Sequence, residues 1–141
     1  MKKTKKIIGC TWILLKGAEI LMMLRDKKPN IPYPDSWVFP GGTLEGRETV
    51  RQACIRELKE ELGYTPPSME EILVIHYPNS KTEEHFFLIP FNLEEEQIKL
   101  GEGQKVKFFT LDEIENLCLG FWCREVIPIV KRYLLKKAKK E

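Results

Sequence analysis

The chain has 141 residues, of which 43% are hydrophobic and 31% charged, a length and composition typical of one globular domain spanning residues 1–141. Its 23 basic and 21 acidic residues leave a net charge of only +2, which disfavours a nucleic acid as partner. No apolar run is long enough to span a membrane, and the four cysteines form no C-x2-C pair, so we expect a cytoplasmic protein with reduced thiols and no membrane partner.

The first half of the chain alternates short apolar segments with turns. We expect strands at Ile7–Leu15 and Glu19–Arg25, joined as a hairpin by a turn at residues 16–18. Three prolines make residues 26–35 a loop. A short strand at residues 37–39 ends in Pro40-Gly41-Gly42, which we interpret as a turn without side chains. Residues 49–62 then predict a helix that ends at Gly63.

The second half contains further strands and a final helix. We expect strands at residues 71–77 and 84–91, joined by a polar turn at 78–81, and another at 105–109. Thr110 and Glu113 are typical of a capping box that opens a short helix. Apolar residues recur at helical spacing from 124 to 137, where Pro128 lies in the first turn or kinks the helix. The pattern predicts an α+β fold, a mixed sheet between helices in an α/β/α sandwich.

The helix at residues 49–62 carries three carboxylates on one side. Glu57, Glu60 and Glu61 fall within roughly a 100° arc. A separate apolar stripe that would pack on the sheet consists of Ile55, Leu58 and Leu62. Like charges at the C-terminal end of a helix destabilise it. The pattern indicates either a solvated surface helix or a functional site, where a hard cation such as Mg²⁺ or Mn²⁺ would bind the acids.

Two neighbouring features fit a cation or phosphate site. The backbone at Gly41 and Gly42 would approach a metal or phosphate closely, because glycine has no side chain. Arg56 would pair with Glu48 through its two-pronged guanidinium and hold the preceding loop to the helix.

From Gly42 to Tyr64 the sequence reads G-x5-E-x7-R-E-L-x-E-E-x-G-Y. It resembles the Nudix box, G-x5-E-x7-R-E-U-x-E-E-x-G-U, in which U is a bulky aliphatic residue. Every fixed letter matches, and the one departure is Tyr64 at the final U. The preceding segment from Trp37 to Gly42 is similar to the lead-in W-x-x-P-G-G of the same family. The resemblance implies a Nudix-type sandwich and a MutT-like pyrophosphohydrolase.

The resemblance also implies a mechanism, in which water attacks a diphosphate linked to another moiety, with Mg²⁺ or Mn²⁺ as cofactor. The substrate would be a small nucleotide or nucleoside diphosphate derivative, and one such activity cleanses the nucleotide pool. Glu57, Glu60 and Glu61 would bind the metal, with the Gly41 carbonyl as a further ligand. Glu57 or Glu60 would be the general base. The catalytic set is completed by two supporting residues, Arg56 and Glu48.

Other candidates lie outside the box. Family members often recruit a further acid, and Glu102 is our candidate because glycines flank it in a loop before a strand. Glu83 and Glu84 are the alternatives, and an exposed loop acid without a role fits Glu102 equally well. For the substrate, Arg25 would meet terminal phosphates and Tyr33 would stack on a base.

Two other functions stay open at this point. One is a Nudix-fold nucleotide-binding sensor or regulatory module without turnover, and the other is a hydrolase acting on RNA ends. MutT-type members place Asn or Asp before the final helix to read the purine edge, whereas a rough alignment places Cys123 there. The base therefore stays open, as does the oligomeric state, for which a homodimer is one option.

Overall fold

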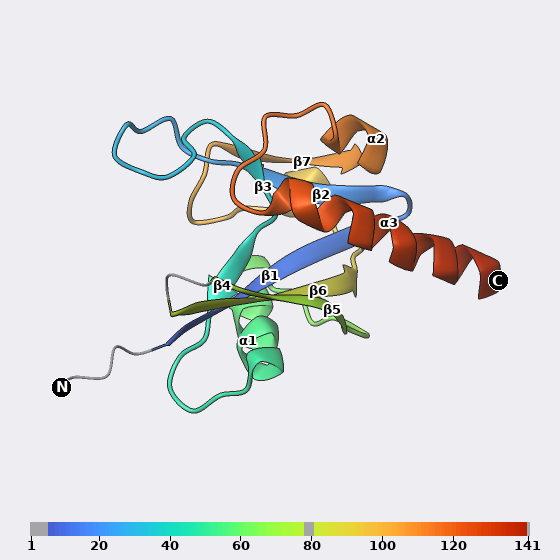
Figure 1. Cartoon of the computed structure of the whole chain (residues 1–141), viewed down its shortest axis with the longest axis horizontal. Coiled ribbons are helices and arrows are strands. Elements are labelled where there is room, and N and C mark those ends of the chain that lie inside the picture. The colour runs from blue at the N-terminus through green and yellow to red at the C-terminus, as the bar shows by residue number, and fades with distance from the viewer. Residues whose placement is uncertain (1–5, 78–80, 141) are drawn as a thin grey trace.

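The computed structural model describes residues 6–77 and 81–140, so the predicted turn at residues 78–81 lies largely outside it. Within these residues seven strands form one mixed sheet between helices (Figure 1). The strands are β1 (Ile7–Lys16), β2 (Glu19–Leu24), β3 (Trp37–Val38), β4 (Gly41–Thr43), β5 (Glu70–His76), β6 (Thr82–Pro90) and β7 (Lys105–Thr110). The helices are α1 (Val50–Leu62), α2 (Leu111–Ile114) and α3 (Cys123–Lys140), with a 3₁₀ turn η1 at Glu95–Gln97. The predicted fold class is confirmed.

Strand β1 organises the sheet. It pairs in parallel with β6 along most of its length, from Ile7 opposite Thr82 to Leu15 opposite Pro90. Its other edge pairs with β2 only next to their connecting turn, and with β4 nearer its N-terminal end. The predicted hairpin is therefore present but short. Because β1 and β2 separate beyond it, the β3–β4 segment lies between them, and the backbone amide of Trp12 donates to the Pro40 carbonyl at 2.8 Å.

The interpretation of Pro40-Gly41-Gly42 as a turn was wrong, because Gly41 and Gly42 belong to strand β4. Gly41 pairs with Thr11 of β1, and a Cβ atom at Gly41 would lie only 2.2 Å from the Cys10 carbonyl oxygen. The glycine thus permits a close approach of two strands rather than a turn. Local sequence does not reveal this pairing, because the partner strand lies about thirty residues away in the chain.

Two hydrophobic cores lie on the two faces of the sheet, because successive strand residues point to opposite sides. Trp12 of β1 packs with Leu58 of α1 in one core. Ile13, its neighbour on β1, packs with Val126 and Val130 of α3 in the other. Figure 1 accordingly shows α1 on the opposite side of the sheet from α2 and α3. Both helical layers are therefore anchored on the same central strand.

The helix ends follow local sequence signals. Thr49 caps α1 by accepting a hydrogen bond from the Gln52 amide, and Gly63 ends it in the left-handed conformation with φ 61°. Thr110 caps α2 as predicted. Pro128 lies inside α3, beyond its first turn. Among the described residues, no helix is both long and apolar enough to cross a membrane.

The predicted packing face of α1 is correct for Leu58 but wrong for Ile55. Ala53, Cys54 and Leu58 are buried, whereas Ile55 remains 37% exposed. Ala53 and Cys54 precede Glu57 by about one turn, so the acidic side of α1 continues its buried side. The acids therefore lie on the same side of α1 as Ala53 and Cys54, about one turn after these buried residues.

Candidate functional site

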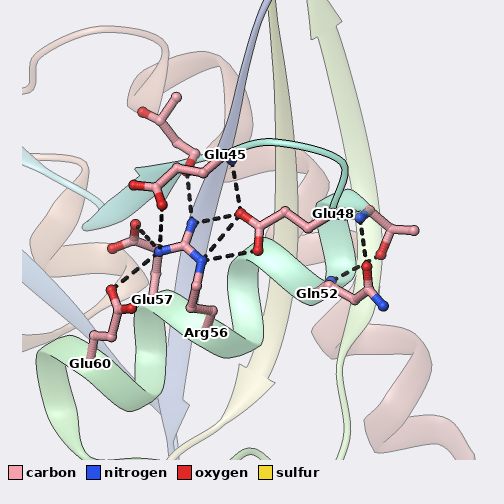
Figure 2. A network of polar contacts seen from close by, with 8 residues as sticks. Glu45, Glu48, Gln52, Arg56, Glu57 and Glu60 are labelled. Carbon is pink, nitrogen blue, oxygen red and sulfur yellow. Dashed lines mark hydrogen bonds and ion pairs between the residues drawn. The ribbon is translucent and has the colours of Figure 1, made fainter.

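Arg56 anchors the acidic end of α1 to the segment before it (Figure 2). Its Nε donates to both carboxylate oxygens of Glu48, at 3.2 and 3.0 Å, and its Nη2 donates to Glu48 Oε1 at 2.7 Å. Nη2 also donates to the Thr43 carbonyl at the end of β4, at 3.2 Å. These bonds hold the pKa of Glu48 below its usual value. The predicted pairing of Arg56 with Glu48 is therefore present and joins loop, strand and helix.

The same guanidinium group brings two of the predicted acids together. Arg56 Nη1 lies 2.9 Å from Glu57 Oε1 and 3.2 Å from Glu60 Oε2, and Figure 2 shows both carboxylates directed toward it. Glu45 also approaches Nη1, at 3.7 Å. Sequence reasoning missed Glu45 because a loop acid has no helical spacing to indicate it. Glu57 and Glu60 thus share one positive charge.

Glu57 is the most shielded of the three helix acids whose convergence was predicted. Its side chain is only 15% exposed and lies against Gly42 of β4. A Cβ atom at Gly42 would come within 2.6 Å of Glu57 Cγ. The absence of a side chain at Gly42 therefore makes room for Glu57 beside β4.

Glu61 takes a different direction. Its Oε2 accepts a hydrogen bond from the Gly101 amide at 3.3 Å, next to the candidate acid Glu102. Across the described parts of the chain, no three His, Cys, Asp or Glu side chains form a group able to hold a metal ion. The five predicted metal ligands therefore remain a prediction.

The donor set nevertheless fits a hard divalent cation. It consists only of oxygen atoms, which Mg²⁺ and Mn²⁺ prefer. A cationic nitrogen of Arg56 already lies between Glu57 and Glu60, so these two carboxylates are arranged around a positive charge. Gly41 and Glu102 line the neighbouring pocket, and their chain neighbours Gly42 and Gly101 contact Glu57 and Glu61 of α1.

A pocket of about 440 Å³ opens where β1 and β2 separate, a size typical of small-molecule sites. Its walls come from the strands around this opening and from the segment before α3. The charged and polar lining includes Thr11, Arg25, Glu84 and Glu102, and the aromatic lining includes Tyr77, Phe86, Phe121 and Trp122. Gly41 and Gly42 also line it. Because Gly42 contacts Glu57 as well, the pocket and the acidic helix meet at β4.

The two predicted substrate-binding residues lie near the pocket in different ways. Arg25 lines it, with its guanidinium carbon 5.0 Å from the centre of the Phe121 ring. Tyr33 is half exposed and lies against Phe121, a lining residue, with ring centres 4.8 Å apart and the rings tilted by 52°. Tyr33 and Phe121 both have positive φ, 49° and 48°, a strained conformation for aromatic residues that is common at functional sites.

Thr11 and Glu84 were not identified from the sequence as substrate-binding candidates. Thr11 Oγ1 donates to Glu84 Oε1 at 2.5 Å, and burial raises the pKa of Glu84. Sequence reasoning considered Glu84 only as an alternative metal acid. The parallel pairing of β1 with β6 brings the two residues together. They are 73 positions apart in the chain, so no local sequence pattern predicts their contact.

Comparison with known proteins identifies the family. The model of the NUDIX domain matches residues 5–128. An ADP-ribose pyrophosphatase of Methanocaldococcus jannaschii is 32% identical over 108 residues, which cover 74% of this chain and 62% of that protein, so this chain spans less than two thirds of its length. An 8-oxo-dGTP diphosphatase of Escherichia coli K12 is 43% identical over 91 residues, 63% of this chain and 67% of that protein.

The solved structures agree on the fold. A mutT/nudix family protein from Listeria innocua superposes with a TM-score of 0.81 at 19% identity, covering 99% of this chain and 100% of that one. The likeness in structure shows the fold, and the family match spans most of the sequence together with the acidic helix. The chain belongs to the NUDIX domain family.

Proposed function

We propose that this chain is a divalent-metal-dependent hydrolase that cleaves the pyrophosphate bond of a nucleoside diphosphate derivative. The observation that carries the proposal is the convergence of Glu57 and Glu60 on one positive charge, beside a pocket of nucleotide size. Two relatives named for hydrolysis of such compounds, an ADP-ribose pyrophosphatase and an 8-oxo-dGTP diphosphatase, support this class of substrate.

Glu57, Glu60 and Glu61 would hold Mg²⁺ or Mn²⁺, with the Gly41 carbonyl and Glu102 as further oxygen donors. Such an ion, when bound, neutralises phosphate charge and favours attack by water. When the metal binds, Glu57 and Glu60 would exchange Arg56 Nη1 for the ion. The Arg56 side chain would keep its position, because Nε and Nη2 still bond to Glu48 and to the Thr43 carbonyl. The guanidinium group would then keep β4 and α1 in register.

The remaining roles belong to side chains around the pocket. Glu57 or Glu60 would accept the proton of the attacking water. Glu57 lies against Gly42, which lines the pocket, and Glu60 shares Arg56 Nη1 with Glu57. Arg25 would attract the negatively charged phosphates at the pocket wall. Tyr33 would support the base through its contact with Phe121.

A substrate panel in ¹⁸O-labelled water tests the proposal. ADP-ribose, 8-oxo-dGTP, dGTP and a dinucleoside polyphosphate are incubated with the protein and with Mg²⁺, Mn²⁺ or a chelator. We expect turnover of at least one compound that requires the metal, with ¹⁸O in one phosphate-containing product. Absence of turnover for all of them would contradict the proposal, and tight binding without turnover would indicate the nucleotide-binding sensor instead.

A further inference from the structure

The pocket wall holds a carboxylate that the proposed hydrolysis does not use. Glu84 projects from β6 against β1, where Thr11 donates to its Oε1 at 2.5 Å. Gly9 of β1 provides the space, because a Cβ atom there would come within 2.2 Å of Glu84 Oε2. All three residues line the pocket. The Glu84 carboxylate therefore packs against β1 at Gly9, and Thr11 fixes one of its two oxygens by a hydrogen bond.

The second oxygen, Oε2, has no hydrogen-bond donor among the described residues. It lies over Gly9, where the strand has no side chain, and both Gly9 and Glu84 line the pocket. A mostly buried carboxylate without enough donors is costly, and burial raises the pKa of Glu84 accordingly. A ligand that offers N–H groups would supply the missing hydrogen bonds.

Flat aromatic side chains line the same pocket as this carboxylate. Tyr77 and Trp122 lie against each other with ring centres 5.2 Å apart, and Phe86 and Phe121 complete the aromatic lining. Such surfaces stack well on planar rings. The combination of flat walls and one acceptor group describes a site for a planar heterocycle that carries donors on one edge.

We propose that Glu84 selects a guanine-type base as the nucleoside part of the substrate. An ionised carboxylate only accepts hydrogen bonds. Guanine is the standard base with two adjacent donors, N1–H and N2–H, on its pairing edge, and an 8-oxo group leaves that edge unchanged. Adenine instead places the acceptor N1 beside its amino group, which would face a carboxylate oxygen. The inference rests on the proposed function for the reaction, but base selection is measurable without turnover.

Calorimetric binding of nucleoside monophosphates tests the inference directly. GMP, IMP and AMP are titrated into the wild type, into Glu84→Gln and into the control Glu70→Gln, an exposed carboxylate on neighbouring β5. The titrations are run near pH 8, where carboxyl groups are normally ionised. We expect the wild type to bind GMP roughly 10- to 100-fold more tightly than AMP, as for hydrogen bonds to a charged group. IMP lacks the N2 amino group and should bind between the two.

The Glu84→Gln variant should bind GMP roughly 10- to 100-fold more weakly and AMP at least as tightly as the wild type, because an amide pairs well with adenine. Glu70→Gln should keep the wild-type ratio. A second variant, Gly9→Ala, displaces the carboxylate without removing it and should also lose the preference for GMP. Circular dichroism checks that each variant is folded, and the wild-type ratio alone decides the question if a variant is not.

Equal binding of GMP and AMP by the wild type, or undetectable binding of GMP, would overturn the inference. A Glu84→Gln variant that slows turnover of every nucleotide equally with an unchanged GMP-to-AMP ratio would also overturn it, because Glu84 would then serve the chemistry. Selective GMP binding by a protein without hydrolase activity would support base selection while contradicting the proposed function.

Discussion

Arg56 divides its contacts between two tasks. Nε and Nη2 bind Glu48 and the Thr43 carbonyl, whereas Nη1 binds Glu57 and Glu60. The sequence predicted the pair with Glu48 from residue types and spacing. It did not predict that Glu57 and Glu60 share a single nitrogen, because side-chain directions depend on what packs around them. Nε and Nη2 of this guanidinium hold the helix to the segment before it, and Nη1 is the positive charge that Glu57 and Glu60 share.

Replacing Glu60 separates its effect on turnover from an effect on folding. Its side chain is 59% exposed, so Glu60→Gln should leave the thermal unfolding midpoint close to that of the wild type. Turnover of the best panel substrate should fall by about 100-fold or more, as expected when a general base or a charged ligand is lost. Glu96→Gln in the exposed turn η1 is the control. Unchanged turnover in Glu60→Gln would remove this residue from the site.

Glu84 should make the stability of the protein depend on pH. Burial raises its pKa in the folded state, so between the unfolded and folded pKa the folded protein binds more protons, and stability falls as pH rises through that window. The Glu84→Gln variant has no carboxyl group at this position, so this fall in stability with rising pH is absent. The variant should therefore have a larger free energy of unfolding than the wild type near pH 8, and the difference should shrink toward pH 4.

Urea unfolding of both proteins over this pH range measures the difference. Carboxyl groups with a lowered pKa, such as Glu48 and Glu113, make the free energy of unfolding rise with pH. Their contributions are the same in both proteins and cancel in the difference. Tyr77 faces Glu84, and burial raises its pKa to about 12, so it stays neutral throughout. A difference that grows toward acid pH would contradict the prediction.

At the scale of elements, β4 and α1 form one unit that positions Glu57. The limits of α1 followed from Thr49 and Gly63, because caps are local signals. Strand β4 was not predicted from the sequence, because Gly41 and Gly42 show no alternation of apolar and polar residues that would indicate a strand. Its existence depends on β1, and its closeness to α1 depends on the absence of a side chain at Gly42.

Gly42→Ala tests this unit. The new Cβ atom would come within 2.6 Å of Glu57 Cγ, so Glu57 or the whole helix must shift. Because a misplacement of about 1 Å at a site can cost about 100-fold in rate, we expect a loss of that order in turnover while the far-ultraviolet circular dichroism spectrum stays unchanged. Steady-state kinetics at saturating Mg²⁺ measures it. Wild-type rates would show that α1 tolerates the change and that Glu57 needs no close contact with β4.

At the scale of the whole molecule, β1 joins the two cores. Trp12 and Ile13 are neighbours in sequence but belong to different cores. Loss of packing on one face should therefore weaken the other, and we propose that the described residues form one cooperative unit, as expected for a single domain.

Leu58→Ala in the α1-side core tests cooperativity. The side chain is fully buried, so its loss should reduce the free energy of unfolding by about 2–5 kcal/mol. Tryptophan fluorescence and far-ultraviolet circular dichroism should follow a single urea transition at the same midpoint, and Val130→Ala in the opposite core should also shift both signals together. Separate transitions for the two signals would contradict a single cooperative unit.

The sequence by itself determined the fold class, both ends of α1, the start of α2, the family and the pairing of Arg56 with Glu48, because caps, hydrophobic period and motif spacing are local signals. The tertiary structure alone decided that Gly41 and Gly42 form a strand, that Glu57 and Glu60 meet at one nitrogen while Glu61 turns to Gly101, and that Glu84 lies beside Thr11. These outcomes depend on strand pairing and packing between distant segments, for which no short pattern in the chain carries the information.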